Sequence, residues 1–112
     1  MADNVVRVCA KADIASETVK AFEVGDLRLA VFNIGGQFYV TDDECTHASA
    51  SLADGILEGD VIECSLHFGA FHVPTGEVKA PPCELALRTY KVVLQGDDIF
   101  ADLDRNAAGE PA

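Results

Sequence analysis

Positive charge is scarce in this chain. Its 112 residues include 8 Lys and Arg against 19 Asp and Glu, a formal net charge of −11. Because phosphate groups attract the opposite sign, we expect neither nucleic acid nor an anionic membrane surface as a partner. The acidic excess itself has two compatible interpretations, a solvated surface that keeps the protein soluble and electrostatic steering toward partners with basic patches.

Long apolar runs are also missing. No segment reaches the ~20 apolar residues that a membrane-spanning helix needs. The start, Met1-Ala2-Asp3-Asn4, has neither the basic residues nor the apolar stretch of a signal peptide. We therefore expect a soluble, cytoplasmic protein, and the length predicts a single domain over residues 1–112. Nor does the sequence show a nucleophile–base pair, which argues against an enzyme.

Turn signals punctuate the chain at short intervals and predict an all-β protein. Gly25-Asp26, Gly35-Gly36 and Gly59-Asp60 each separate two short apolar runs, as in two-residue hairpins. Pro74–Glu77 and Gln95–Asp98 mark two further turns. No regular alternation with helices is visible, so the pattern favours a small antiparallel sandwich or barrel.

The apolar runs between these turns are the predicted strands. Leu27, Leu29 and Val31 are expected to share one strand face. One helical turn is expected over Lys11–Ala15. The strands are predicted at Val5–Cys9, Lys20–Val24, Leu27–Ile34, Gln37–Thr41, Ile56–Glu58, Val61–Glu63, Glu84–Leu94 (the longest) and Ile99–Leu103.

Residues 42 to about 83 interrupt this meander and are predicted to form a separate lobe on a β base. The base would comprise about residues 1–41 and 84–103. The polar tail, residues 104–112, is expected to fray.

Two cysteine–histidine pairs dominate the predicted lobe. Cys45-Thr46-His47 is followed, sixteen residues later, by Cys64-Ser65-Leu66-His67. Two thiolates and two imidazoles divided between two loops can bridge two irons, with the cysteines on one iron and the histidines on the other. The four residues therefore predict a Rieske-type [2Fe–2S] centre, with the histidine-ligated iron outermost.

A Cys₂His₂ zinc site needs the same residue types and is the main alternative. Zinc fingers usually pair Cys with Cys and His with His, whereas each pair here is mixed. Cys9 and Cys83 have no His or Cys at metal spacing and are interpreted as passive residues. His72 is interpreted as a turn or strand histidine.

Beyond the four ligands, the chain resembles the Rieske ferredoxins of bacterial ring-hydroxylating dioxygenase systems. The resemblance rests on the two ligand pairs and their spacer, and on three neighbouring segments. These are Phe68-Gly69-Ala70-Phe71, Ser51-Leu52-Ala53-Asp54-Gly55 with the following Leu57-Glu58-Gly59 turn, and Ala80-Pro81-Pro82.

The resemblance implies a Rieske fold, an antiparallel β-sandwich base with a smaller cluster-binding lobe. It implies that the cluster is covered by the two ligand loops and by the loop at Pro81 and Pro82, with Phe68 and Phe71 as apolar packing. It further implies an electron carrier that receives single electrons from an NAD(P)H-dependent flavoprotein reductase. The carrier would pass them to a terminal aromatic-ring oxygenase. An alternative is a Rieske-like small subunit of an enzyme such as nitrite reductase.

The chain departs from the Rieske proteins of respiratory complexes at four positions. Where those proteins carry two bridging cysteines, the resemblance places Ala50 and Leu66 of this chain. Where they carry serine and tyrosine hydroxyls that bond the cluster sulfurs, it has Gly69 and Phe71. Fewer hydrogen-bond donors leave the negative charge of the cluster less stabilised.

We therefore predict a reduction potential at the low end of the Rieske range, roughly −150 mV. Redox titration of the purified protein measures it directly. A clearly positive midpoint would contradict the argument from the missing donors.

Overall fold

The computed structural model describes residues 4–45, 50–65, 69–80 and 85–111. Strands dominate this part of the chain, together with two short 3-10 helices, and none of its helices is long and apolar enough to cross a membrane. In chain order the elements are β1 (Val5–Ala10), η1 (Lys11–Asp13), β2 (Thr18–Val24), β3 (Leu27–Ile34), β4 (Gln37–Asp42), η2 (Leu52–Asp54), β5 (Ile56–Glu58), β6 (Val61–Glu63), β7 (Ala70–His72), β8 (Val78–Ala80), β9 (Thr89–Gln95) and β10 (Asp98–Asp102).

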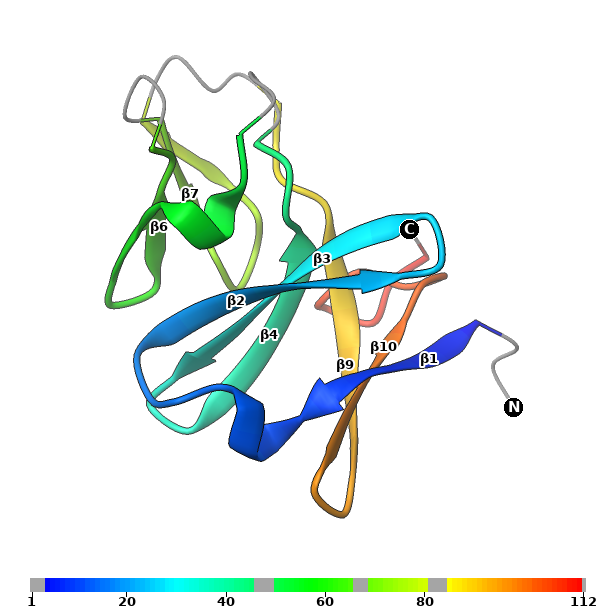
Figure 1. The fold of residues 1–112 in the computed structure, drawn as a ribbon. Coiled ribbons are helices and arrows are strands. Elements are labelled where there is room, and N and C mark those ends of the chain that lie inside the picture. Colours follow the sequence, from blue (N-terminus) through cyan, green and yellow to red (C-terminus); the bar gives the residue numbers. More distant parts are fainter. Residues whose placement is uncertain (1–3, 46–49, 66–68, 81–84, 112) are drawn as a thin grey trace.

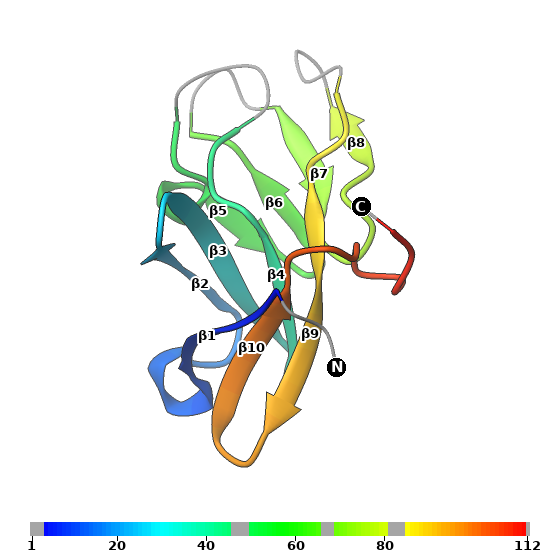
Figure 2. The same cartoon turned by 90° about the vertical axis from the view of Figure 1, so that its right-hand side faces the viewer.

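The strands form two antiparallel sheets, as the turn spacing predicted. A six-stranded sheet has the order β1-β10-β9-β4-β3-β2, and a four-stranded sheet has the order β5-β6-β7-β8. The larger sheet curls on itself, and the smaller sheet lies beside one end of it (Figures 1 and 2). We refer to the six-stranded sheet as the base and to the four-stranded sheet with its loops as the lobe.

Strand β3 is buried on both faces and separates two hydrophobic cores. Leu29 and Val31 point into the core of the base, together with Val40, Tyr90 and Ile99. Leu27 packs against the same core, which confirms the predicted strand face. The alternate residues of β3, Ala30 and Phe32, belong instead to the core of the lobe. Because alternate residues of a strand point to opposite faces, β3 contributes to both cores and connects the base to the lobe.

The predicted hairpins are present, and Gly59 illustrates why. It joins β5 to β6 with a φ of 57°, a left-handed conformation that costs glycine little. Strands β3, β5 and β6 have the bounds that the sequence predicted, and η1 lies within the expected helical turn at Lys11–Ala15.

The longest predicted strand is shorter than expected at its start. The sequence predicted a strand over Glu84–Leu94, but β9 begins at Thr89. The backbone before it turns toward the lobe, where the Leu87 N–H donates to the Gly76 carbonyl at 2.8 Å. Gly76 has a φ of 77°, and a methyl group on it would overlap the Leu87 carbonyl oxygen. This contact joins Leu87 to a glycine eleven residues earlier in the sequence, so local apolar patterning could not reveal it.

The C-terminal segment also differs from expectation, since residues 104–111 fold back on the base. The Lys91 N–H donates to the Arg105 carbonyl at 3.0 Å, and the Ala107 N–H donates to Thr89 Oγ1 at 2.9 Å. Arg105 pairs with Pro111 in an isolated bridge. These hydrogen bonds hold a polar segment that composition alone predicted to be loose.

Candidate metal centre

The two predicted cysteine ligands come together in the core of the lobe. Cys45 follows β4 and Cys64 follows β6, and both are buried, with exposed fractions of 2% and 0%. Their core also contains Leu52, Ile62 and Phe71. The topology therefore brings two cysteines nineteen residues apart into one apolar environment.

Both cysteines begin loops whose two ends are joined by the same kind of backbone hydrogen bond. The Cys45 N–H donates to the Ala50 carbonyl at 2.9 Å, and the Cys64 N–H donates to the Gly69 carbonyl at 2.7 Å. Each bond joins a cysteine to the residue five positions later. The two hydrogen-bonded loops, which we call the loop frames, therefore have the same length, although the spacing from cysteine to histidine differs between them. The chain on either side of the three undescribed internal segments runs to the same end of the molecule (Figures 1 and 2).

The predicted imidazole ligands, His47 and His67, lie outside the described residues. Pro81, Pro82, Cys83, Phe68 and Leu66 lie outside them too. Among residues 4–45, 50–65, 69–80 and 85–111, no three His, Cys, Asp or Glu side chains form a metal-binding group. The cysteine half of the predicted ligand set is thus described, and the histidine half remains a prediction.

A buried carboxylate links the two ends of the first ligand loop. Asp43 lies two residues before Cys45, and its side chain is only 1% exposed. It accepts hydrogen bonds from Arg28 Nε at 2.8 Å, from the Ser51 hydroxyl at 2.5 Å and from the Ala53 N–H at 3.0 Å. Because Asp43 precedes the loop while Ser51 and Ala53 follow it, one side chain joins both ends.

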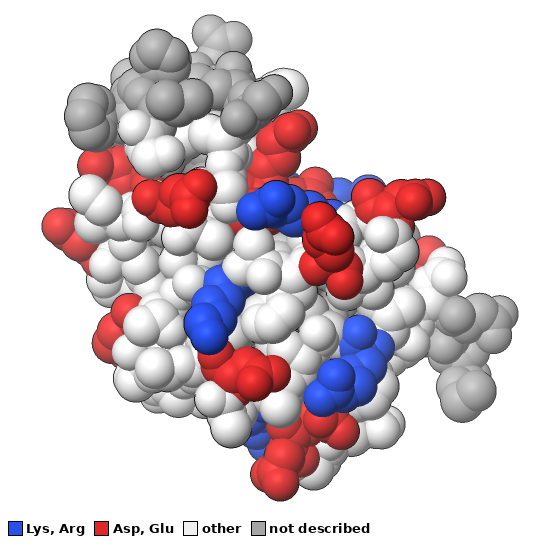
Figure 3. Space-filling model, in the orientation of Figure 1, with Lys and Arg blue, Asp and Glu red and all other residues white. Residues whose placement is uncertain are grey.

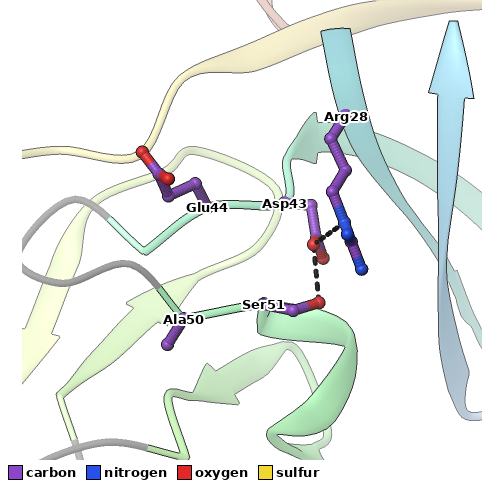
Figure 4. A pocket seen from close by; sticks show the side chains of 5 residues that line it. All are labelled: Arg28, Asp43, Glu44, Ala50 and Ser51. Atoms are coloured by element: carbon purple, nitrogen blue, oxygen red, sulfur yellow. Dashed lines mark hydrogen bonds and ion pairs between the residues drawn. The ribbon is translucent and has the colours of Figure 1, made fainter.

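Backbone bonds reinforce this arrangement. The Asp43 N–H donates to the Arg28 carbonyl at 3.0 Å, and the Leu52 N–H donates to the Asp43 carbonyl at 2.7 Å. Figure 4 shows the side chains around a hollow of about 140 Å³, which is lined by Arg28, Asp43, Glu44, Ala50 and Ser51. The Arg28 side chain is 57% exposed, so the guanidinium balances the buried carboxylate while remaining hydrated.

This role of Asp43 could not be predicted from the sequence. It stands in the run Asp42-Asp43-Glu44, which resembles a solvated acidic stretch. Only the fold shows that Asp43 is buried while its neighbour Glu44 is exposed.

Two further candidate residues, Cys9 and Phe71, are buried in the hydrophobic cores. Cys9 lies in the core of the base, not of the lobe, as a buried free thiol. Desolvation, assisted by the nearby charge of Asp13, raises the pKa of that thiol to about 11, which disfavours the thiolate form that binds metal. Phe71 is fully buried in the core of the lobe, as the packing interpretation predicted.

His72 connects two turns of the lobe. Its Nδ1 lies 2.8 Å from Thr75 Oγ1, and its Nε2 lies 2.9 Å from Asp60 Oδ2. The Thr75 hydroxyl also accepts from the Glu77 N–H at 3.2 Å. His72 is the last residue of β7, and its imidazole ties the β5–β6 turn to the turn before β8, so it is a strand histidine, one of the two predicted alternatives.

The structure fits the predicted cluster at the residues it describes. Cysteine thiolates bind iron best where water is excluded and the backbone is fixed. Cys45 and Cys64 meet both conditions, because they are buried in one core and each closes its own loop frame.

The Asp43 network predicts a graded loss of stability. Replacing Asp43 with Ala leaves the half-buried Ser51 hydroxyl and Ala53 N–H without their acceptor, at a cost of roughly 1.5–3 kcal/mol for each lost hydrogen bond to the charged carboxylate. Arg28→Gln keeps those two donors but leaves the buried carboxylate without its cation, at a smaller cost of roughly 1–3 kcal/mol. Urea unfolding and amide hydrogen exchange at Cys45 measure both effects.

The matched control is Asp54→Ala, which removes an exposed carboxylate next to the same loop. We expect it to behave like the unmodified protein. Equal stability of the Asp43→Ala and Asp54→Ala variants would contradict the proposed role of the buried carboxylate.

Comparison with known proteins identifies the family. Residues 4–91 match the family model of the Rieske [2Fe-2S] domain. The ferredoxin component of biphenyl 2,3-dioxygenase from Rhodococcus jostii is 43% identical over 100 residues, which cover 89% of this chain and 94% of that protein. The ferredoxin component of the p-cumate 2,3-dioxygenase system from Pseudomonas putida is 41% identical over 102 residues, 89% of this chain and 86% of that one.

Solved structures agree with the sequence relatives. A ferredoxin from Sphingomonas yanoikuyae B1 superposes with a TM-score of 0.85 at 37% identity, covering 88% of this chain and 98% of that one. A chain in the complex of reduced oxygenase and oxidised ferredoxin of carbazole 1,9a-dioxygenase superposes with a TM-score of 0.83 at 39% identity, covering 97% and 96%. The predicted fold, family and [2Fe–2S] cofactor are thereby confirmed, and this chain belongs to the Rieske [2Fe–2S] domain family.

Proposed function

We propose that this protein is the ferredoxin component of an aromatic-ring dioxygenase system. It would accept single electrons from an NAD(P)H-dependent flavoprotein reductase and deliver them to the terminal oxygenase. The observation that carries the proposal is the similarity over nearly the whole chain to ferredoxin components, including one solved together with its oxygenase. The reductase is inferred from the resemblance of the sequence to this class of ferredoxin.

The proposed ligands are Cys45 and Cys64 for one iron and His47 and His67 for the other. When bound, the cluster supplies reversible one-electron chemistry. The burial of both cysteines supports placing the thiolate-bound iron toward the protein interior. The imidazoles would then provide the side of the site that a partner approaches.

The surroundings of the loops support a carrier more than a catalyst. Four protein ligands leave neither iron an open position for substrate. The loop frames and the Asp43 network fix the backbone on both sides of the first ligand pair. A site with little freedom to rearrange suits electron transfer, because a small geometric change between oxidation states favours rapid exchange.

The acidic lobe suggests how partners are attracted. No Lys or Arg occurs from residue 29 to residue 78, whereas that segment contains eight acidic residues. Those eight are Asp42, Asp43, Glu44, Asp54, Glu58, Asp60, Glu63 and Glu77. Clustered charge of one sign speeds encounter with a partner of the opposite sign, and weak redox complexes depend on this effect because they bury little area.

The three histidines of the chain provide a direct test of the ligand assignment. We expect His47→Ala and His67→Ala each to abolish the visible absorption and circular dichroism of a Rieske cluster, since each removes one iron ligand. His72→Ala is the matched control, because that imidazole bonds Thr75 and Asp60 instead. It should keep the spectrum.

A Rieske spectrum that survived in the His47 or His67 variant would refute the assignment. To test the carrier role itself, the reduced protein is mixed with oxidised terminal oxygenase, and reoxidation is followed in a stopped-flow instrument. Failure of the reduced protein to donate electrons would favour the alternative, a permanently attached subunit.

A further inference from the structure

The outer face of the β5–β6 hairpin has an unusual arrangement of side chains. The strand register pairs Ile56 with Glu63 and Glu58 with Val61. Because cross-strand partners project from the same face, these four side chains lie together. The remaining pair, Leu57 and Ile62, points the other way into the core of the lobe. Apolar and acidic groups therefore alternate diagonally across the outer face.

This face is hollowed and accessible. Ile56, Glu58, Val61 and Glu63 together line a depression of about 240 Å³. Ile56 is 57% exposed, which is unusual for a large aliphatic residue in a strand. Strand β5 is also the edge of its sheet, so within the described chain no further strand covers it. We call this depression the hairpin groove.

The two glutamates of the hairpin groove have no ionic partner in the described chain. No salt bridge or side-chain hydrogen bond within the described part of the chain involves Glu58 or Glu63. In Figure 3 the described surface of the lobe, at the upper left, shows acidic atoms among uncharged ones, while the Lys and Arg atoms lie over the base. Two unpaired carboxylates beside exposed apolar surface indicate a site for a cation with an apolar stem.

We propose that the hairpin groove docks a lysine or arginine side chain of the electron-accepting partner. The methylene stem of such a side chain packs against Ile56 and Val61, and its charged head pairs with Glu58 and Glu63. Glu63 directly precedes the ligand Cys64, so a partner held in the groove lies beside the second ligand loop. The inference rests on the proposed function and specifies where on the acidic lobe the partner binds.

Stopped-flow reduction of cytochrome c tests the hairpin groove. Cytochrome c is a basic one-electron acceptor that presents lysine side chains around its haem edge. We expect Glu58→Gln/Glu63→Gln to lower the second-order rate constant roughly 5- to 10-fold at low ionic strength, as steered association allows. The difference should shrink as salt screens the charges.

The matched control is Glu23→Gln/Glu110→Gln, which removes the same charge from exposed positions on the base and in the C-terminal segment. At the same ionic strength it should change the rate constant less than about 2-fold, because its charges lie farther from the proposed contact and the Coulomb energy falls with distance. Equal effects of the two double variants would overturn the groove and leave only a contribution of net charge. If the unmodified protein failed to reduce cytochrome c at all, the proposed function itself would fail.

Carbodiimide cross-linking locates the contact independently of rate. The reagent joins a carboxylate to a lysine that touches it, and peptide mass spectrometry identifies the carboxylate. Cross-links from Glu58 or Glu63 to cytochrome c support the proposal. Cross-links confined to other acidic residues contradict it.

Discussion

Burial of β3 on both faces is the constraint on which the rest of the structure depends. Leu29 and Val31 complete the core of the base, while Ala30 and Phe32 complete the core that contains Cys45 and Cys64. A shift of the strand by one residue would exchange these two sets and disrupt both cores together. The ligand loops are therefore anchored to a large sheet, although the lobe that carries them has only short strands of its own.

On this frame, two kinds of interaction prepare the loops. Backbone bonds from Cys45 to Ala50 and from Cys64 to Gly69 give both loops the same closure. The Asp43 carboxylate adds a side-chain connection under the first loop, balanced by the half-exposed Arg28. In contrast to the paired and buried Asp43, acidic groups on the surface of the lobe such as Glu58 and Glu63 have no ionic partner in the described chain. The hydrogen-bonded loop ends and the acidic surface of the lobe both fit the proposed role of an electron carrier.

Much of this architecture could be predicted from the sequence because its signals are local. Turn glycines marked the hairpins, alternation marked β3, and the mixed Cys–His pairs indicated the cofactor that the family comparison confirms. Contacts between distant segments could not be predicted. The burial of Asp43 among two acidic neighbours, the docking of Leu87 on Gly76 and the folded C-terminal segment all depend on partners that only the tertiary structure brings near.

We propose that two cysteines and two histidines of this chain hold one [2Fe–2S] cluster. Pulsed electron paramagnetic resonance of the dithionite-reduced protein tests it most directly, because the unpaired electron couples to nitrogen nuclei bound to iron. We expect a reduced-cluster signal with couplings from two directly bound imidazole nitrogens. One of these couplings should be lost in each of the His47 and His67 variants that still binds a cluster. A signal without bound nitrogen would indicate an all-cysteine cluster, and a colourless protein that contains zinc would rule out an iron–sulfur cluster.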